Sequence, residues 1–306
     1  MASLDTQDFL EIDDLSRVEI ESILRDALDV KRGSYDGSLD TENLGMVFQK
    51  RSTRTRVSFE AGMNQLGGDG VFLSQEDIQL GRGETIGDTG RSLSRYLDVL
   101  MARVYSHDDL QDLAEYSDIP VINGLSNFNH PCQALSDLFT LTEVCDRTLE
   151  EVSVAWLGDG NNVCHSLMVA AAMVGMDISV ATPSEHRPSP EVEEKASGEA
   201  EVSGSSVVVT NSPEKALDGA DAVYTDSWVS MGDDDKDLGL FEPFQVTEEV
   251  LDRGSDDCVF MHCLPAHRGH EVVDEVIDGD RSVVWRQAEN RMHVQKTLIL
   301  SLLGSL

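Results

Sequence analysis

The sequence predicts an α/β protein of two lobes, each a parallel sheet with helices on both faces. Apolar, strand-like runs alternate with helical patterns along the chain, which is typical of parallel sheets joined by helical crossovers. The clearest unit is a strand over Val152–Leu157, a glycine-rich turn, a helix over Val163–Val174 and a strand over Asp177–Ala181. The length of 306 residues fits one large domain or two ordinary ones.

The first part of the chain repeats this alternation. Apolar residues at helical spacing mark the helices, and short apolar runs mark the strands. In chain order we expect a helix over Arg17–Lys31, a strand over Gly45–Gln49, a helix over Thr53–Leu66, a strand over Gly70–Leu73, a helix over Thr85–Tyr96, and strands over Val99–Arg103 and Pro120–Ile122.

The second part continues in the same way and ends in a helix. We expect a helix over Cys132–Val144, the unit described above, strands over Ser206–Thr210, Ala222–Thr225 and Val259–Met261, and an amphipathic helix over Arg291–Leu306. The boundary between the lobes is predicted near residue 135, with the C-terminal helix returning to the first lobe. The two domains then comprise residues 1–134 plus 287–306, and residues 135–286.

The chain is strongly acidic, with 23 Lys and Arg against 57 Asp and Glu and a formal net charge of −34. Only six of the basic residues are Lys, and the acids are scattered along the chain. Self-repulsion on this scale destabilises a compact fold, whereas at molar salt the screening length falls to about 3 Å. We therefore expect a protein adapted to concentrated salt; an acidic protein of ordinary cytosol is the alternative. No basic run offsets the charge, which argues against nucleic acid as a partner.

Cysteine usage and the N-terminus indicate the compartment. The five cysteines form no Cys-x-x-Cys pair, and an odd number does not suit a disulfide framework. The stretch Met1–Asp5 has neither the basic nor the apolar region of a signal peptide, and no run of about 18 apolar residues follows. These features predict a cytoplasmic protein that does not associate with membranes.

The segment Ser52-Thr53-Arg54-Thr55-Arg56 follows a predicted strand and opens a helix. Hydroxyl groups, free N–H groups at the positive end of a helix dipole and guanidinium groups together suit a phosphate or another oxyanion. Ser52 is also a good N-cap, so helix capping is the structural alternative. Two arginines in the first helical turn oppose the dipole, which favours the oxyanion site.

Two further segments follow predicted strands, at the edge where α/β sheets bind ligands. His130-Pro131-Cys132-Gln133 opens a helix, and an imidazole in this position suits donation to a polarised carbonyl group. A lone histidine is more often structural, so this motif alone is weak. Arg103 ends an apolar strand without an acidic neighbour, which favours a role as an anion clamp.

The turn Gly158-Asp159-Gly160-Asn161-Asn162 looks like the start of a dinucleotide-binding fingerprint. Val163 stands where the third glycine is expected, however, and the next strand ends at Ala181 without an acid for a ribose. The two asparagines at a helix N-terminus instead suit a ligand carboxylate.

Two segments near the ends of later strands carry acidic and metal-ligating side chains. Asp226 suits an ammonium group and has Ser230 close behind it, although one more solvated aspartate is the default interpretation. His262-Cys263-Leu264-Pro265 is followed by His267 and His270, which suggests zinc, but the spacing matches no common ligand pattern.

Together these motifs resemble the carbamoyltransferase (transcarbamylase) family over essentially the whole chain. Ser52–Arg56 resembles its STRTR motif, His130–Gln133 its HPxQ motif, His262–Pro265 its HCLP motif and Asn290-Arg291 its closing NR pair. Asp226 with Ser230-Met231-Gly232 resembles the DxxxSMG pattern of the ornithine branch. The aspartate branch has a lysine in the loop after its second strand, whereas Gln75–Gly81 contains none.

The resemblance implies two sets of site residues. Carbamoyl phosphate would be bound by Ser52, Thr53, Arg54, Thr55, Gln79, Arg103, His130, Pro131, Cys132, Gln133, Cys263, Leu264 and Arg291. Ornithine would be bound by Asn162, Asp226, Ser230 and Met231. The catalytic residues would be Arg54, His130, Cys263 and Arg291. Gln79 would come from a neighbouring subunit, which implies a homotrimer or a larger assembly with sites at its interfaces, and Leu264-Pro265 is expected to be a cis peptide.

The implied reaction moves the carbamoyl group of carbamoyl phosphate to the δ-amine of ornithine, a reversible step of arginine metabolism that yields citrulline and phosphate. It requires no metal or organic cofactor. One alternative is a carbamoyltransferase for another amine, such as putrescine. Another is a binding protein of the same fold without turnover, which the presence of Arg54, His130 and Arg291 argues against.

Overall fold

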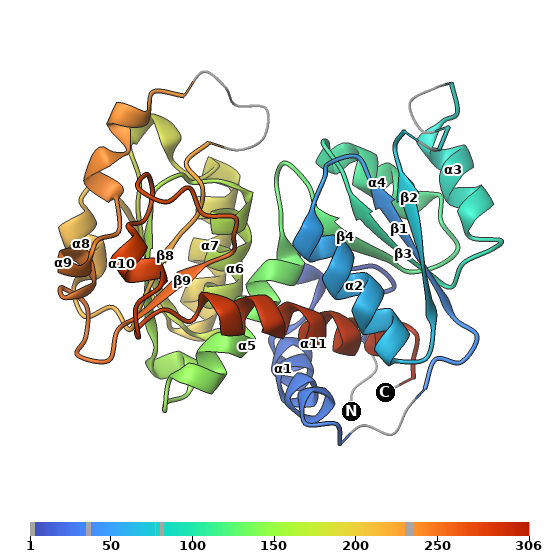
Figure 1. Cartoon of the computed structure of the whole chain (residues 1–306), viewed down its shortest axis with the longest axis horizontal. Helices are drawn as coiled ribbons and strands as arrows, with labels where there is room; N and C mark the ends of the chain where they lie inside the picture. Colours follow the sequence, from blue (N-terminus) through green and yellow to red (C-terminus); the bar gives the residue numbers. More distant parts are fainter. Residues whose placement is uncertain (1–3, 35–37, 77, 80–82, 230–235, 306) are drawn as a thin grey trace. The chain divides into compact units, whose positions relative to one another are not determined.

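The computed structural model describes residues 4–34, 38–76, 78–79, 83–229 and 236–305. The chain divides into two compact units (Figure 1). Unit 1 comprises Met1–Phe139 and Glu289–Leu306, and unit 2 comprises Thr140–Ala288. The N-terminal and C-terminal parts of the chain therefore belong to the same unit.

Unit 1 is built on a four-stranded sheet whose strands are all parallel, in the order β2-β1-β3-β4. The strands are β1 (Asn43–Phe48), β2 (Asp69–Ser74), β3 (Val99–Arg103) and β4 (Val121–Leu125). The helices that begin in this unit are α1 (Arg17–Lys31), α2 (Thr53–Gln65), α3 (Ile86–Leu93), α4 (His107–Glu115) and α5 (Pro131–Val144).

Alternation of side chains along the strands of unit 1 places apolar groups on both faces of the sheet. One face, which includes Val47, Leu100 and Ala102, packs against Leu110 and Leu113 of α4. Helix α2 lies along the opposite face, next to α11 (Val284–Leu302) (Figure 1). A Cβ at Gly62 of α2 would lie only 3.2 Å from Lys296 Cγ of α11, so the two helices approach each other closely at this glycine.

Unit 2 contains a five-stranded parallel sheet in the order β7-β6-β5-β8-β9. The strands are β5 (Ser153–Leu157), β6 (Asp177–Ala181), β7 (Val207–Thr210), β8 (Ala222–Thr225) and β9 (Val259–His262). The helices are α6 (Asn162–Val174), α7 (Pro190–Ser203), α8 (Pro213–Leu217), α9 (Glu248–Leu251) and α10 (Asp274–Ile277), in addition to the first turns of α11.

The two faces of the second sheet are covered by different helices. Ala155, Leu157 and Phe260 share one core cluster with residues of α8, α9 and α10. Trp156 and Tyr224 point to the other face, where their rings lie 5.0 Å apart. Helices α6 and α7 lie together on that side (Figure 1). Both sheets thus have the parallel, doubly covered architecture that the strand–helix alternation predicts, and the α/β fold class is confirmed.

Most predicted elements are present. Five helices were not expected, because they are short or carry few large apolar residues: α4, α7, α8, α9 and α10. Helix α7, for example, buries only Val192, Ala196 and Ala200. The last helix begins at Val284 and not at Arg291, since the buried Val284 and Gln287 extend its inner face. The third helix ends at Leu93, short of the expected Tyr96.

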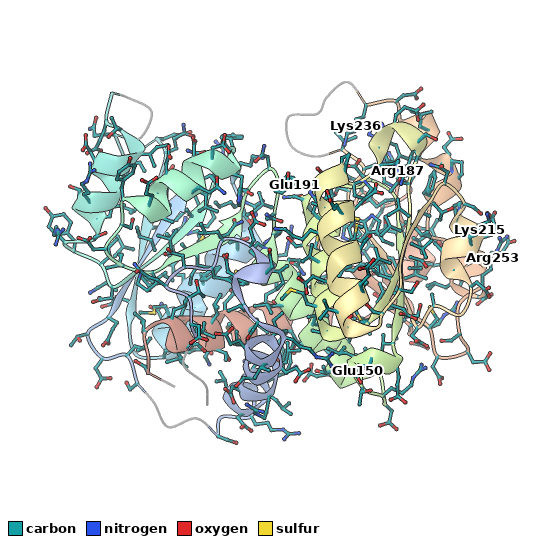
Figure 2. All side chains as sticks on the ribbon, turned by 180° about the vertical axis from the view of Figure 1, so that it is seen from behind. Glu150, Arg187, Glu191, Lys215, Lys236 and Arg253 are labelled. Carbon is teal, nitrogen blue, oxygen red and sulfur yellow. The ribbon has the colours of Figure 1, made fainter. Side chains whose placement is uncertain are left out.

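Among the described residues, no helix is both long enough and apolar enough to cross a lipid bilayer. The surface carries dense polar and charged side chains, as Figure 2 shows for unit 2, where acids such as Glu150 and Glu191 and cations such as Arg187 and Arg253 are labelled. Several of these cations are paired: Arg187 contacts Glu193 at 2.9 Å, and Arg253 contacts Glu249 at 3.4 Å. Exposed pairs of this kind contribute at most about 1 kcal/mol each.

Candidate active site

The predicted oxyanion segment lies at the N-terminus of α2, directly after β1. Ser52 is the N-cap, and its Oγ accepts a hydrogen bond from Thr55 N at 3.2 Å. The side chain of Thr55 is fully buried, whereas Arg54 is half-buried and Thr53 is exposed. Ser52 therefore caps the helix, and the positive end of the helix is left to interact with an anion.

Arg56 differs from the other basic residue of this segment. Its Nε lies 3.2 Å from Glu60 Oε2, and its guanidinium group lies 3.8 Å from the centre of the Phe72 ring. Arg56 thus contacts a carboxylate of its own helix and stacks on a ring of β2, which gives its place in the first turn a structural explanation. A contribution of its charge to the oxyanion site stays a prediction.

Arg291 connects the last helix to this segment. Its Nη2 donates to Thr55 Oγ1 at 2.9 Å, and only 4% of the residue is exposed. Arg103, at the end of β3, is 8% exposed. Strands β1 and β3 are neighbours at which the strand order reverses, and ligands of parallel α/β sheets bind at such a switch point.

His130 follows β4, the next strand of the same sheet edge, and immediately precedes α5. Burial, and then the positive charges of Arg291 and Arg103, hold the pKa of His130 well below its usual value. The imidazole is therefore neutral at neutral pH and has one N–H to donate. Arg291 thus contacts Thr55, and the charges of Arg291 and Arg103 both act on His130. N–H donors and cations of this kind suit a developing negative charge on oxygen.

The first turn of α5 contributes Pro131, Cys132 and Gln133, all buried. Gln133 Nε2 donates to Asp137 Oδ1 at 2.8 Å, which fixes the amide; within the described part of the chain its buried Oε1 has no hydrogen-bond partner. A ligand NH₂ group would satisfy that oxygen. The Cys132 thiol donates to Asn123 O at 3.4 Å, and burial raises its pKa to about 12, so it remains a thiol.

Gln79, the residue expected to reach a neighbouring subunit, follows β2 and is exposed. No residue of unit 1 holds its side chain in any hydrogen bond that the structure describes.

Unit 2 has a carboxylate at the carboxyl ends of its own parallel strands. Asp226 follows β8, between the ends of β5 and β9. Asn161 Nδ2 donates to Asp226 Oδ2 at 2.8 Å, and Cys263 Sγ donates to Asp226 Oδ1 at 3.0 Å. Each carboxylate oxygen is therefore oriented by one donor, and the group keeps lone pairs for a further donor such as an ammonium group.

The two asparagines of the glycine-rich turn have different positions. Asn161 is the N-cap of α6, and its Oδ1 accepts from Val163 N and Cys164 N at 3.0 and 3.1 Å. Asn161 was expected to bind a ligand carboxylate, but its side chain instead caps the helix and holds Asp226. Asn162 is half-buried in the first turn of α6. Ser230 and Met231 lie outside the described residues.

The HCLP segment follows β9. The Leu264-Pro265 peptide is cis, as predicted, and Leu264 has a φ of 61°, a left-handed conformation that is uncommon for a leucine. Leu264 N donates to His262 Nδ1 at 2.8 Å, and His262 Nε2 lies 3.3 Å from Glu271 Oε1. Asp226, His262 and Cys263 have ligand atoms within 4.8 Å of one another, but both ring nitrogens of His262 are engaged, so these three residues do not fit a metal ion.

A buried ion pair next to this site has no counterpart among the predicted residues. Lys236 Nζ donates to Asp159 Oδ2 at 2.8 Å, and His186 Nδ1 lies 3.5 Å from Asp159 Oδ1. Burial raises the pKa of Asp159, while Lys236 lowers it. Asp159 and Lys236 are 77 residues apart, and one acid among many in this chain carries no sequence signal for such a pairing.

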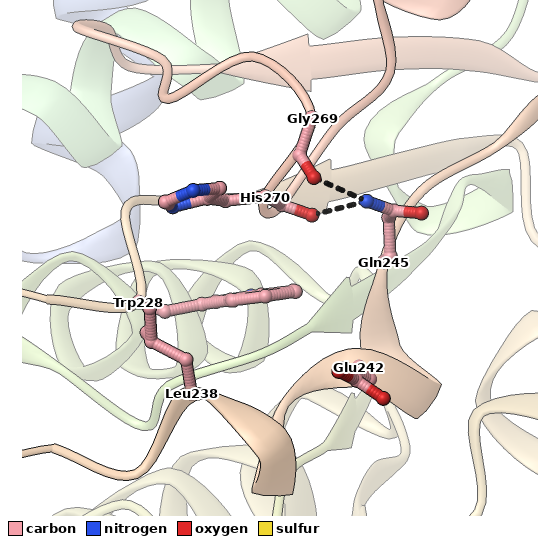
Figure 3. A pocket seen from close by; sticks show the side chains of 6 residues that line it. All are labelled: Trp228, Leu238, Glu242, Gln245, Gly269 and His270. Atoms are coloured by element: carbon pink, nitrogen blue, oxygen red, sulfur yellow. Dashed lines mark hydrogen bonds between the residues drawn. The ribbon is translucent and has the colours of Figure 1, made fainter.

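Unit 2 also has an open pocket of about 450 Å³ (Figure 3), lined by Trp228, Leu238, Glu242, Gln245, Gly269 and His270. Gln245 Nε2 donates to the carbonyl oxygens of Gly269 and His270, which ties its wall together. None of the six lining residues is Lys or Arg, so this pocket does not suit a phosphate or a carboxylate. The candidate anion-binding groups, Arg103 and the N-terminal turn of α2, instead follow or end strands of unit 1.

The fold and these groups define an enzyme of two parallel α/β units, one with a buried cationic cluster and one with an oriented carboxylate. The chain belongs to the aspartate/ornithine carbamoyltransferase family. Residues 7–143 match the carbamoyl-P binding domain of that family, and residues 150–302 match its Asp/Orn binding domain. The resemblance stated from the motifs is confirmed.

Known relatives are similar to the chain over nearly their full length. An ornithine carbamoyltransferase of Bacillus thuringiensis is 47% identical over 99% of this chain and 96% of its own, and one of Anoxybacillus flavithermus is 49% identical over 97% and 96%. The structure of ornithine carbamoyltransferase from Pyrococcus furiosus has a TM-score of 0.95 at 47% identity and covers all of both chains. That of the anabolic enzyme from Campylobacter jejuni has a TM-score of 0.91 at 39% identity, over 97% of this chain and 99% of its own.

Proposed function

We propose that the protein transfers the carbamoyl group of carbamoyl phosphate to the δ-amine of L-ornithine, giving L-citrulline and phosphate. The observation that carries this proposal is the contact of Arg291 with Thr55, at the start of α2, together with the neutral, buried His130. The relatives named ornithine carbamoyltransferase, at 47% identity over almost the whole chain, support the same reaction.

Carbamoyl phosphate fits the residues of unit 1. The phosphate would bind to the N-terminal turn of α2 through Ser52, Thr53, Arg54 and Thr55, with Arg103 from β3 and Gln79 from a neighbouring subunit. The carbamoyl oxygen would accept from His130, Thr55 and Arg291. The carbamoyl NH₂ would donate to Gln133 Oε1, because the Gln133 amide is oriented by Asp137.

The chemistry is a direct acyl transfer. The δ-ammonium group of ornithine, with an intrinsic pKa of about 10.4, first releases one proton to solvent. The neutral amine then attacks the carbamoyl carbon, and the extra proton on its nitrogen passes to the departing phosphate. Negative charge develops on the carbonyl oxygen, where Arg54, Arg291 and His130 stabilise it. The C–O bond to phosphate then breaks, and phosphate leaves with its charge already compensated at the α2 N-terminus.

Ornithine fits the residues of unit 2. Asp226, oriented by Asn161 and Cys263, would accept from the α-ammonium group, and Asn162 would donate to the α-carboxylate. Ser230 and Met231 complete the proposed set. Cys263 would orient the amine, because its thiol contacts the same carboxylate. To deprotonate the amine it would first have to give its own proton to Asp226. A carboxylate here disfavours aspartate, whose second carboxylate would need a cation.

We assign carbamoyl phosphate binding to residues 1–134 plus 287–306, and ornithine binding to residues 135–286. The assignment of the last helix to the first domain is supported by Arg291, which contacts Thr55. Putrescine is the alternative acceptor. It lacks the α-carboxylate that Asn162 would bind, so the oriented Asp226–Asn161 pair favours ornithine over putrescine.

The test is a comparison of acceptors in molar KCl. Carbamoylation of ornithine, putrescine, N-acetylornithine and aspartate is measured with carbamoyl phosphate in excess. We expect citrulline to form at least about 100-fold faster than any other product, since the α-ammonium and α-carboxylate contacts are each lost in a competitor. Absence of citrulline, or faster turnover of putrescine, would refute the assignment.

The cellular context follows from the charge and from Gln79. We propose a cytoplasmic, salt-adapted enzyme, on the net charge of −34 and on the paucity of lysine. We also propose a homotrimer or a larger assembly, with Gln79 completing the carbamoyl phosphate site of an adjacent subunit; its exposed side chain is consistent with that role.

A further inference from the structure

Asp159 and Lys236 of unit 2 form an ion pair beside the residues assigned to ornithine. Its nitrogen and oxygen are 2.8 Å apart, and only 9% of the Asp159 side chain and 15% of the Lys236 side chain are exposed. We propose that Lys236 is a positioning residue for the acceptor amino acid: by binding Asp159 it holds the Gly158–Asn162 turn, and so orients Asp226 and Asn162. This inference rests on the proposed ornithine site.

The turn is a closely fitted piece of backbone. Trp156 Nε1 donates to Asp159 O at 2.9 Å, and Gly160 N donates to His186 O at 2.9 Å. A Cβ at Gly160 would lie 2.3 Å from Pro188 N, so only glycine allows this approach. The side chain of Asp159 is a further point at which the turn is held, because Lys236 binds it.

The position of the turn affects the position of Asp226, the carboxylate proposed to bind the ammonium group of the substrate. Asn161 uses its Oδ1 to cap α6 and its Nδ2 to donate to Asp226 Oδ2 at 2.8 Å. Asn161 cannot shift without losing one of these two functions. A displacement of Asp159 would thus change the orientation of Asp226, while the groups of unit 1 keep their own contacts.

Electrostatics gives Lys236 a second effect in the same direction. The charge of Asp226 raises the pKa of Asp159, which means that the two carboxylates repel each other. Lys236 faces Oδ2 of the Asp159 carboxylate, and His186 faces Oδ1. Both lower the cost of the negative charge on Asp159. Without Lys236, the buried Asp159 would compete with Asp226 for the substrate's ammonium group. A buried pair of this kind adds little net stability, but removing one partner leaves an uncompensated charge.

The side chains around the pair form one packed group. The His186 ring lies 4.7 Å from the Phe241 ring, which in turn stacks on Trp228 at 5.5 Å. Trp228 Nε1 and a Cβ at Gly158 would be 3.1 Å apart, so this aromatic group reaches the start of the same turn. The turn is therefore contacted both by this aromatic group, near Gly158, and by Lys236, at Asp159.

The test uses Lys236→Met, Asp159→Asn and the double variant in the full-length enzyme, with steady-state kinetics in molar KCl. Lys236→Met should raise KM for ornithine at least about tenfold and leave KM for carbamoyl phosphate within about twofold. Asp159→Asn in the Lys236→Met background should restore KM for ornithine to within about threefold of wild type, because a neutral amide needs no cation. A residue that merely stabilises the fold would give neither the KM split nor this rescue.

Lys215→Met is the matched control. Lys215 lies on α8 with an exposed side chain, on a different side of unit 2 from Lys236 (Figure 2), and its replacement should change neither KM. The inference is overturned if Lys236→Met leaves KM for ornithine unchanged, if both KM values rise together, or if both Lys236→Met and the double variant fail to fold. A wild-type enzyme that makes no citrulline would instead refute the proposed function, so the two failures are distinguishable.

Discussion

The guanidinium group of Arg291 donates to Thr55 Oγ1 at 2.9 Å, although 236 residues separate the two in the chain. The contact joins the last helix to the first turn of α2, beside the neutral imidazole of His130. Because Arg291 is 4% exposed and Thr55 fully buried, their interaction is weakly screened by salt. The contact between Arg291 and Thr55 therefore holds the guanidinium group in a fixed position within the candidate site.

Replacing Arg291 by Lys should therefore lower kcat. Lysine keeps the charge but loses the planar pair of donors that reaches both Thr55 and a carbonyl oxygen, and we expect a loss of about 100-fold in kcat. KM for ornithine should change little. Arg286→Lys, on the exposed side of the same helix, is the control and should be silent. Equal activities of the two variants would exclude Arg291 from transition-state stabilisation.

Arg54 and Arg56 offer a second matched comparison within one helical turn. Arg54→Ala should lower kcat by at least about 1000-fold while the fold persists, since it removes a donor to the developing oxyanion. Arg56→Ala should leave kcat nearly unchanged and lower the free energy of unfolding by at most about 1 kcal/mol, because Arg56 contacts only Glu60 and Phe72 among the contacts described. Near-normal kcat in Arg54→Ala would refute its catalytic role.

Asn161 combines a cap and a positioning contact, and two substitutions separate them. Asn161→Ser retains a capping oxygen, so its unfolding free energy should stay within about 0.5 kcal/mol, whereas Asn161→Ala should lose about 1 kcal/mol. Both variants lose the donor to Asp226 and should raise KM for ornithine by about tenfold. Chemical denaturation and acceptor kinetics measure the two effects independently. A Ser variant with wild-type KM would show that Asp226 does not depend on Asn161.

His130 predicts a specific dependence of stability on pH. Its folded-state pKa lies well below 6.5, so above pH 6.5 neither state binds the proton and the group is neutral with respect to unfolding. Below pH 6.5 the unfolded chain takes up a proton that the folded chain does not. The unfolding free energy should then fall by up to about 1.4 kcal/mol per pH unit more steeply than in His130→Gln. Parallel slopes for the two proteins between pH 6.5 and 5 would contradict a neutral, buried His130.

Salt should stabilise this protein strongly. With a net charge of −34, we expect the unfolding free energy and the activity to rise between 0.1 M and molar KCl, as screening removes the repulsion among surface acids. The measurement is thermal unfolding as a function of KCl concentration, with sucrose as a control for excluded-volume effects. Full stability and activity in dilute buffer would overturn the salt-adapted assignment and leave the enzymology untouched.

The sequence predicts the fold well wherever large apolar residues recur. Strands such as Val99–Arg103 and Asp177–Ala181 are found with the predicted bounds, because a fully buried parallel strand has few alternatives. Helix α7 was not predicted, since its buried stripe consists of Val192 and two alanines. Its packing against α6 depends on tertiary contacts that a local pattern does not contain.

The candidate site shows the same division between local and long-range information. Ser52 and His130 lie at strand–helix junctions that the sequence marks by itself. The role of Asn161 differs from expectation because the neighbouring carboxylate, Asp226, is 65 residues away. The contact of Arg56 with Phe72 of β2 was not predicted for a similar reason, since the sequence around Arg56 does not indicate it.

The membership of the last helix in unit 1 has a consequence for how the protein is made. Unit 2 is contiguous in the chain and can fold as soon as Thr140–Ala288 has left the ribosome. Unit 1 must wait, because Arg291 reaches Thr55, Lys296 reaches Gln65, and Asn290 accepts from Lys31. The half synthesised first is thus completed last. During translation, the cationic cluster stays unassembled until the final helix emerges, so a nascent or C-terminally truncated chain should be inert toward carbamoyl phosphate.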